Sequence, residues 1–194
     1  MSGMLAMDEL VAVTRARLAG RQRRVVVGGP LVKAAVLLPL VDRGEPFVVF
    51  AKRTDRVGTH RGQISFPGGR VDASDAGFLE AALRESEEEI GLPRTAVEAL
   101  GALDDTETVA TQFIITPFVG VVRAPVAWQP DGHEIEKVIE VPLAALRDLA
   151  NLRVEYRERG GVRHEILFWD YQGETIWGAT ARILKQYLDV LADG

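Results

Sequence analysis

The chain contains no cysteine among its 194 residues. This absence excludes disulfide bonds, cysteine nucleophiles and zinc sites built on thiolates, and it favours a reducing compartment such as the cytoplasm. Long apolar runs are also missing, and no segment approaches the roughly 20 apolar residues that a membrane-spanning helix needs. The first 18 residues include Asp8 and Glu9 and lack a continuous apolar stretch, so they do not resemble a secretory signal. We therefore expect a cytoplasmic protein without a membrane partner.

Positive charge is in deficit, because 23 Lys and Arg residues against 28 Asp and Glu residues give a formal net charge of −5. Nonspecific nucleic-acid binding depends on basic patches, so this balance argues against a nucleic-acid partner. A small anionic ligand is not excluded, because a bound metal ion can supply local positive charge. With 47% hydrophobic residues, the chain has enough apolar material for a substantial core. We expect residues 1–30 to form an N-terminal helix and linker, and residues 31–194 to form the main domain.

The hydrophobic pattern predicts a mixed sheet with few helices. Helical spacing covers residues 7–19, 75–90 and 175–191, and 142–149 is a short helix with proline at its first position. Apolar or alternating segments predict strands at 33–41, 46–52, 63–66, 70–71, 96–108, 112–122, 136–141, 152–157 and 164–169. Pro117 indicates a bend or a sheet edge, because proline cannot donate to a strand ladder. The fold class is therefore α+β or an αβα sandwich.

Residues 84–92 carry the most informative pattern, Arg-Glu-Ser-Glu-Glu-Glu-Ile-Gly-Leu. On a helix, an apolar-patterned stripe that includes Ser86 and Ile90 faces one way, and three glutamates fan out on the opposite side. These glutamates are Glu85, Glu88 and Glu89. Neighbouring like charges destabilise a helix unless a cation lies among them, and oxygen ligands suit a hard divalent cation such as Mg²⁺. A solvated acidic face is the alternative interpretation, but the adjacent Arg84 and the preceding Pro-Gly-Gly turn favour a metal site.

Gly69 and residues 84–92 together resemble the Nudix box, which reads Gly, five residues, Glu, seven residues, and then Arg-Glu-apolar-any-Glu-Glu-any-Gly-apolar. The second half matches closely, with Ser86 in the apolar slot. In the first half Asp75 replaces the glutamate, and eight residues rather than seven separate it from Arg84. The resemblance implies a Nudix hydrolase with an αβα sandwich and a mixed sheet over residues 31–194. It also implies Mg²⁺ or Mn²⁺ held by the three glutamates, and it leaves the role of Asp75 open.

A second match lies upstream of the box. Residues 53–69 are similar to the extra signature of the coenzyme A diphosphatase branch, in which Arg and a small residue precede His-x-Gly-x-Ile-Ser-Phe-Pro-Gly-Gly. A box that begins with Asp and is one residue longer is usual in that branch, and residues 176–184 resemble its last helix. The resemblance implies hydrolysis of coenzyme A, with acyl derivatives as further candidates, to 3′,5′-ADP and 4′-phosphopantetheine. The alternatives are a Nudix hydrolase of another nucleoside diphosphate, such as ADP-ribose, NADH or a damaged nucleotide, and a non-catalytic Nudix-like binding module.

Diphosphate hydrolysis needs a metal ion and an activated water molecule. We expect a backbone carbonyl of Gly68 or Gly69 to complete the metal shell, because glycine lets the backbone approach closely. Arg84 is expected to orient one carboxylate, with a surface salt bridge as the alternative. Glu134 is the candidate general base or fourth acidic ligand. The next candidates are Glu136 and Glu107.

Substrate contacts are expected from the glycine-rich segment before the box. Arginine side chains suit the diphosphate and 3′-phosphate of coenzyme A, and the histidine suits phosphate binding or loop orientation better than base catalysis. A solvated loop is the alternative. The predicted substrate-binding residues are Arg53, Arg56, His60, Arg61, Gly62, Ser65, Gly68 and Gly69. The predicted partner is a small-molecule substrate, and a homodimer is one permitted assembly.

Overall fold

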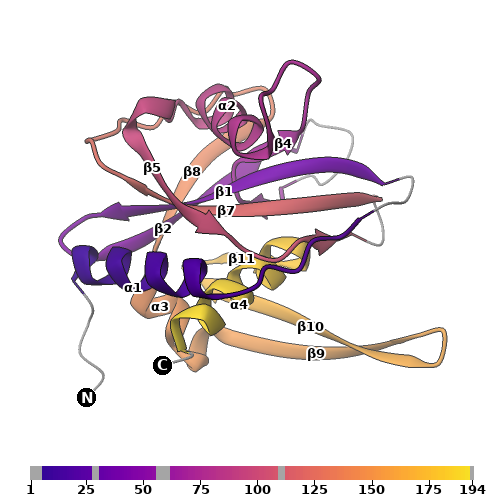
Figure 1. Ribbon diagram of the computed structural model, residues 1–194. Coiled ribbons are helices and arrows are strands. Elements are labelled where there is room, and N and C mark those ends of the chain that lie inside the picture. Colours follow the sequence, from indigo (N-terminus) through magenta and orange to yellow (C-terminus); the bar gives the residue numbers. More distant parts are fainter. Residues whose placement is uncertain (1–5, 28–30, 56–61, 109–111, 193–194) are drawn as a thin grey trace.

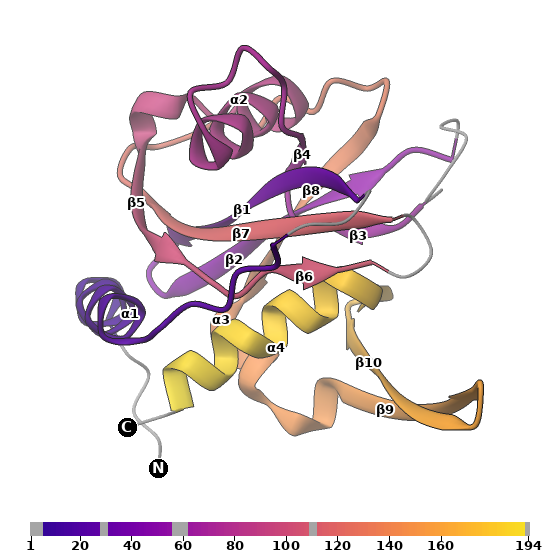
Figure 2. The same cartoon turned by 45° about the vertical axis from the view of Figure 1, so that its right-hand side comes forward.

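The fold consists of three layers in a computed structural model that describes residues 6–27, 31–55, 62–108 and 112–192. Helix α2 (Phe78–Ile90) covers one face of a mixed sheet, while α1 (Met7–Gly20) and α4 (Gly178–Ala192) lie on the other side (Figures 1 and 2). This arrangement confirms the predicted αβα sandwich. No helix among the described residues is long and apolar enough to cross a membrane.

The centre of the sheet is a parallel pair, β1 (Val32–Asp42) and β7 (Phe113–Val122). The other strands of this sheet are β2 (Pro46–Arg53), β3 (Ile64–Ser65), β4 (Gly68–Arg70), β5 (Val97–Ala102), β6 (Thr106–Glu107) and β8 (Ile135–Pro142). Strand β2 pairs with β1 only near the connecting turn, at residues 46–48. Further along, β2 pairs with β3 and β1 pairs with β4. This branching brings the Pro-Gly-Gly segment under α2.

Strand β1 is buried along most of its length, as expected for a strand covered by helices on both faces. Ala35 and Leu37 pack in the cluster that includes Ala82 and Ile90 of α2. Alternate residues of the same strand, such as Leu38, pack in the larger cluster beneath α1 and α4. The sheet therefore separates two hydrophobic cores, and the smaller one supports α2.

Helix α1 is tied to α4 by polar contacts as well as by packing. The Thr14 hydroxyl lies 3.1 Å from the Tyr187 hydroxyl, and neither residue is exposed to solvent. Arg17 donates a hydrogen bond to the carbonyl of Val190 over 2.8 Å. The helix predicted at residues 7–19 is thus present and contributes to the larger core.

A second, three-stranded sheet consists of β9 (Leu152–Arg159), β10 (Val162–Tyr171) and β11 (Glu174–Trp177). It follows the short helix α3 (Leu143–Arg147) and the 3₁₀ turn Leu149–Asn151. The predicted hairpin around residues 160–161 is confirmed. The last helix begins later than predicted, at Gly178, because residues 174–177 pair with β10 as a strand.

Two predictions for the strands of the main sheet were wrong. The single strand predicted at 96–108 begins after a 3₁₀ turn (Arg94–Ala96) and is divided into β5 and β6. Pro117 lies in the interior strand β7 and not at a sheet edge. It sits opposite the break between β5 and β6, where its carbonyl accepts the Leu103 N–H over 2.9 Å. The missing N–H of proline therefore costs no ladder hydrogen bond.

Candidate active site

Helix α2 ends where the sequence indicates. Gly91 adopts the left-handed conformation at φ 68°, and its N–H donates to the carbonyl of Glu87 over 3.1 Å. The N–H of Leu92 donates to the carbonyl of Ser86 over 3.3 Å, which completes a glycine-terminated helix cap. Ser86 is fully buried in the apolar slot, and its hydroxyl donates to the carbonyl of Ala82 over 2.6 Å. That bond satisfies the polar atom within the helix, so the slot remains effectively apolar.

The three glutamates on this side of α2 differ in their exposure to solvent. Glu89 is only 7% exposed, Glu85 is half-buried and Glu88 is exposed. The helix lies over β4 as well as β1, so its acidic side is covered by the backbone of a glycine strand. Two carboxylates are therefore enclosed between α2 and β4.

The glycines of β4 leave room for these carboxylates. The N–H of Gly68 donates to Oε2 of Glu89 over 3.0 Å. A Cβ atom placed on Gly69 would lie 2.5 Å from the carboxylate carbon of Glu85. Any larger residue at position 69 would therefore displace Glu85. The carbonyl ligand expected from Gly68 or Gly69 stays a prediction.

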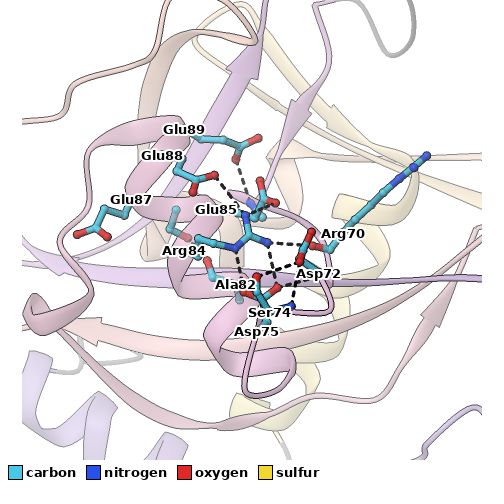
Figure 3. Close-up of polar contacts among 12 residues, drawn as sticks. Arg70, Asp72, Ser74, Asp75, Ala82, Arg84, Glu85, Glu87, Glu88 and Glu89 are labelled. Atoms are coloured by element: carbon cyan, nitrogen blue, oxygen red, sulfur yellow. Dashed lines mark hydrogen bonds and ion pairs between the residues drawn. The ribbon is translucent and has the colours of Figure 1, made fainter.

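Arg84 connects the turn before α2 to the glutamates (Figure 3). Its Nε and Nη2 donate to the two oxygens of Asp75 over 2.9 and 3.0 Å, which is a bidentate geometry. Its Nη1 donates to Glu85 over 2.8 Å and to Glu88 over 3.2 Å. The Asp75 side chain is 2% exposed, so this network differs from a solvated surface pair. Asp75 thus supports the arginine, although it is one residue further from it than the motif requires.

A fourth acid approaches α2 from the loop before β8. Oε2 of Glu134 accepts a hydrogen bond from Nη2 of Arg53 over 2.9 Å, and Nη1 of Arg53 lies 3.9 Å from Oε1 of Glu89. Asp131, which sequence reasoning missed, holds this loop. One of its carboxylate oxygens accepts the N–H groups of His133, Glu134 and Ile135. An Asp-Gly pair within a polar loop is the local signal that could have indicated this turn.

The buried carboxylates have raised pKa values. Burial is the main cause for Glu89, whose pKa rises to about 8, and the charges of Glu85 and Glu134 raise it further. The N–H of Gly68 and the charge of Arg53 act in the opposite direction. Burial also raises the pKa of Glu85, against the effect of Arg84. Repulsion among these acids would be relieved by a cation.

The donor chemistry fits a hard divalent cation, because carboxylate and backbone oxygens are the ligands that Mg²⁺ and Mn²⁺ prefer. Over the part of the chain that the structure describes, no group of three or more Asp, Glu or His side chains converges as a preformed metal site. Nη1 of Arg84 contacts both Glu85 and Glu88, so a positive charge already lies between these two carboxylates. A cation would thus have to compete with Arg84 for Glu88, whose side chain is 59% exposed and able to turn.

The remaining predicted site residues fall into two groups. Arg56, His60 and Arg61 lie outside the described residues. Ser65 lies in β3 opposite Ala51, and Gly62 has a positive φ of 63°. Among the secondary candidates for the base, Glu107 lies beside α4, where its carbonyl accepts a hydrogen bond from Arg182. Glu136 is an exposed residue of β8.

The comparisons with known proteins all indicate the same family. The NUDIX domain family model matches residues 30–160. "Uncharacterized Nudix hydrolase NudL" of Yersinia enterocolitica is 37% identical over 153 residues, which cover 79% of this chain and 78% of the relative. The Salmonella paratyphi B protein of the same name is 38% identical over 154 residues, which cover 79% and 80%.

Two solved structures share the fold at low sequence identity. A MutT/nudix family protein from Enterococcus faecalis has a TM-score of 0.52 at 14% identity, covering 97% of this chain and 70% of that one. DR0079 from Deinococcus radiodurans has a TM-score of 0.52 at 15% identity, covering 79% and 81%. These likenesses bear on the fold alone.

Proposed function

Because the chain belongs to the NUDIX domain family and is a hydrolase of phosphoric anhydride bonds, we propose that its substrate is coenzyme A. The products would be 3′,5′-ADP and 4′-phosphopantetheine, and acyl derivatives are further candidate substrates. The observation that carries this proposal is the signature in residues 53–69, which ends in the two glycines that contact Glu85 and Glu89. The segment to which we assign substrate selection, residues 53–69, therefore leads directly into the carboxylate cluster.

Nudix hydrolases generally use divalent metal ions, and we assign the Mg²⁺ or Mn²⁺ site to Glu85, Glu88, Glu89 and the backbone of Gly69. When bound, the cation neutralises phosphate oxygens and makes a coordinated water more acidic. The enclosed position of Glu85 and Glu89, with the raised pKa of each, supports this assignment. A buried carboxylate gains most from a cation, because burial is what disfavours its charged form.

The side chains of the protein have separate roles in the proposed reaction. Arg84 directs the carboxylate of Glu85 while its fork is held by Asp75. Glu134, whose side chain is 48% exposed and is not among the assigned metal ligands, accepts the proton of the water. The water then attacks a phosphorus of the diphosphate in line with the leaving oxygen.

Product analysis tests the substrate. The purified protein is incubated with coenzyme A, dephospho-coenzyme A or ADP-ribose, with Mg²⁺ or Mn²⁺, and the products are identified by mass. We expect 3′,5′-ADP and 4′-phosphopantetheine from coenzyme A, and a Glu85→Gln variant provides the background rate. Cleavage of ADP-ribose without cleavage of coenzyme A would reject this substrate.

A further inference from the structure

Arg53 lies at an irregular point in the pairing of β2 with β8. The register passes from Lys52 opposite Lys137 to Arg53 opposite Ile135, so Glu136 has no partner of its own. Such a bulge bends the strand and changes the direction of the side chains beside it. Here it occurs at the junction between β8 and the loop that carries Glu134.

Arg53 and its neighbour hold Glu134 by both side chain and backbone. Nη2 of Arg53 donates to Oε2 of Glu134 over 2.9 Å. The N–H of Thr54 donates to the carbonyl of Glu134 over 2.8 Å, and the Thr54 hydroxyl donates to the carbonyl of His133 over 3.0 Å. The end of β2 therefore fixes the backbone position of Glu134 and orients its carboxylate.

The opposite side of the same loop is attached to α2. The N–H of Asp131 donates to the carbonyl of Glu89 over 3.1 Å, and the N–H of Gln129 donates to the carbonyl of Ile90 over 3.0 Å. With the backbone fixed at both ends, rotation of the Glu134 side chain is the main freedom left. The contact with Arg53 restricts that rotation.

The guanidinium of Arg53 faces acids of the site, and one of its donors is inaccessible. Nη2 contacts Glu134, and Nη1 lies 3.9 Å from Oε1 of Glu89. Nε is buried and has no hydrogen-bond partner within the described ranges, so a phosphate could reach it only after rearrangement. This geometry gives Arg53 a contact with Glu134 in addition to the phosphate contact that the sequence predicts.

We propose that Arg53 is a positioning residue that aims Glu134 at the attacking water. The inference rests on the proposed function, because it takes Glu134 as the proton acceptor. Arg53 engages Oε2, and Oε1 remains to accept the proton of the water. Placement within about 1 Å matters for this step, since such a displacement can cost about 100-fold in rate.

A double-mutant cycle tests the coupling, using Arg53→Met, Glu134→Gln and the double variant. We expect Arg53→Met to lower kcat about 10- to 100-fold with KM changed less than about 2-fold. Glu134→Gln should lower kcat by about 100-fold or more, and the double variant should be no slower than Glu134→Gln alone. Arg53→Lys should restore part of the loss, because an ammonium keeps the charge but not the fork.

The matched control is Arg43→Met. Arg43 forms an equivalent pair with Glu140 of β8 at the far end of β2, with hydrogen bonds of 2.6 to 3.3 Å. This variant should retain the turnover of the wild type. Thermal unfolding of every variant shows whether it is folded, and Arg53→Lys replaces Arg53→Met in the cycle if the latter is not.

Three results would overturn the proposal. A raised KM with unchanged kcat would make Arg53 a substrate ligand. If the fold-losses in kcat of the two single variants multiplied in the double variant, Arg53 would not act through Glu134. Calorimetric titration with Mn²⁺ alone gives the third test. Arg53→Met should bind Mn²⁺ at least as tightly as the wild type, because the substitution removes the positive charge of Arg53 near Glu89. Weaker binding would contradict the proposal. The cycle uses whichever diphosphate the wild type cleaves, so failure of coenzyme A as substrate leaves it intact.

Discussion

Glu85 lies against Gly69 so closely that a Cβ atom at residue 69 would be 2.5 Å from its carboxylate carbon. Gly69 is not among the residues with positive φ, so the backbone conformation alone does not require glycine there. The requirement is space for a carboxylate. A motif glycine that is usually read as a turn residue thus determines where a proposed metal ligand lies.

Gly69→Ala should therefore disable the site without unfolding the chain. We expect Mn²⁺ affinity, measured by calorimetry, and kcat each to fall about 100-fold, the scale associated with small displacements of catalytic groups. Gly77→Ala is the matched control, because a Cβ there meets nothing within 4 Å and the φ of 165° is ordinary extended backbone. Equal activity of the two variants would show that Glu85 can move without consequence.

Glu89→Gln should make the metal-free protein more stable at alkaline pH. The pKa of Glu89 is raised from 4.5 to about 8, so the folded state binds its proton more tightly than the unfolded state does. The stability from this group is therefore greatest below about pH 4.5 and is lost as pH rises through about 8. At pH 9 in chelator, Tm of the variant should exceed that of the wild type by about 2–4 °C or more, the shift for about 1 kcal/mol in a domain of this size.

The same substitution should abolish turnover. Removing a ligand charge while keeping the shape should lower kcat by orders of magnitude. The opposite signs of the two effects separate a metal ligand from a structural residue. A variant with lower stability at pH 9 and normal turnover would contradict both parts.

Asp75→Asn should lower the free energy of unfolding by an amount that depends on pH. Hydrogen bonds from Arg84 lower the pKa of Asp75 to about 2 from its ordinary 3.8. A lowered carboxylate pKa gives stability that is present above about pH 4 and is lost as pH falls through about 2. Urea unfolding should therefore show a gap between wild type and Asp75→Asn at pH 7 that closes between about pH 4 and pH 2. If the difference in unfolding free energy persisted at pH 2, the contact between Arg84 and Asp75 could not be its cause.

The local parts of the site could be predicted from sequence. The end of α2 follows from Gly91, because a left-handed residue is needed there and glycine adopts that conformation readily. The turn between β1 and β2 follows from two apolar runs separated by polar residues 42–45. In each case the determining residues are neighbours along the chain.

Contacts between distant segments were not predictable. Arg53 and Glu134 are 81 positions apart, and only the bulge between β2 and β8 brings their side chains together. Burial of Glu89 depends on the glycines of β4, of which Gly68 lies 21 residues upstream and donates to its carboxylate. Helical periodicity describes one helix alone, so it predicts which residues share a side of α2 but not which of them the sheet covers.

Arg61→Ala tests the part of the substrate that distinguishes coenzyme A from its dephospho form. If Arg61 recognises the 3′-phosphate, the substitution should raise KM for coenzyme A about 10-fold or more, in line with loss of a charge-assisted hydrogen bond of about 1.5–3 kcal/mol. KM for dephospho-coenzyme A should be almost unchanged. An equal rise for both substrates would remove Arg61 from 3′-phosphate recognition.

Tyr187→Phe should destabilise the protein and leave the chemistry alone. The Tyr187 and Thr14 hydroxyls are 3.1 Å apart and fully buried, so the substitution leaves a hydroxyl of α1 without a partner, at a cost of about 1–3 kcal/mol. Adding Thr14→Val removes that stranded group, so the double variant should lose less stability in urea than the two single losses combined. Because α1 and α4 lie on the sheet face opposite α2, kcat of each folded variant should match the wild type. A fall in kcat at full folding would instead reveal coupling between the two layers through the sheet.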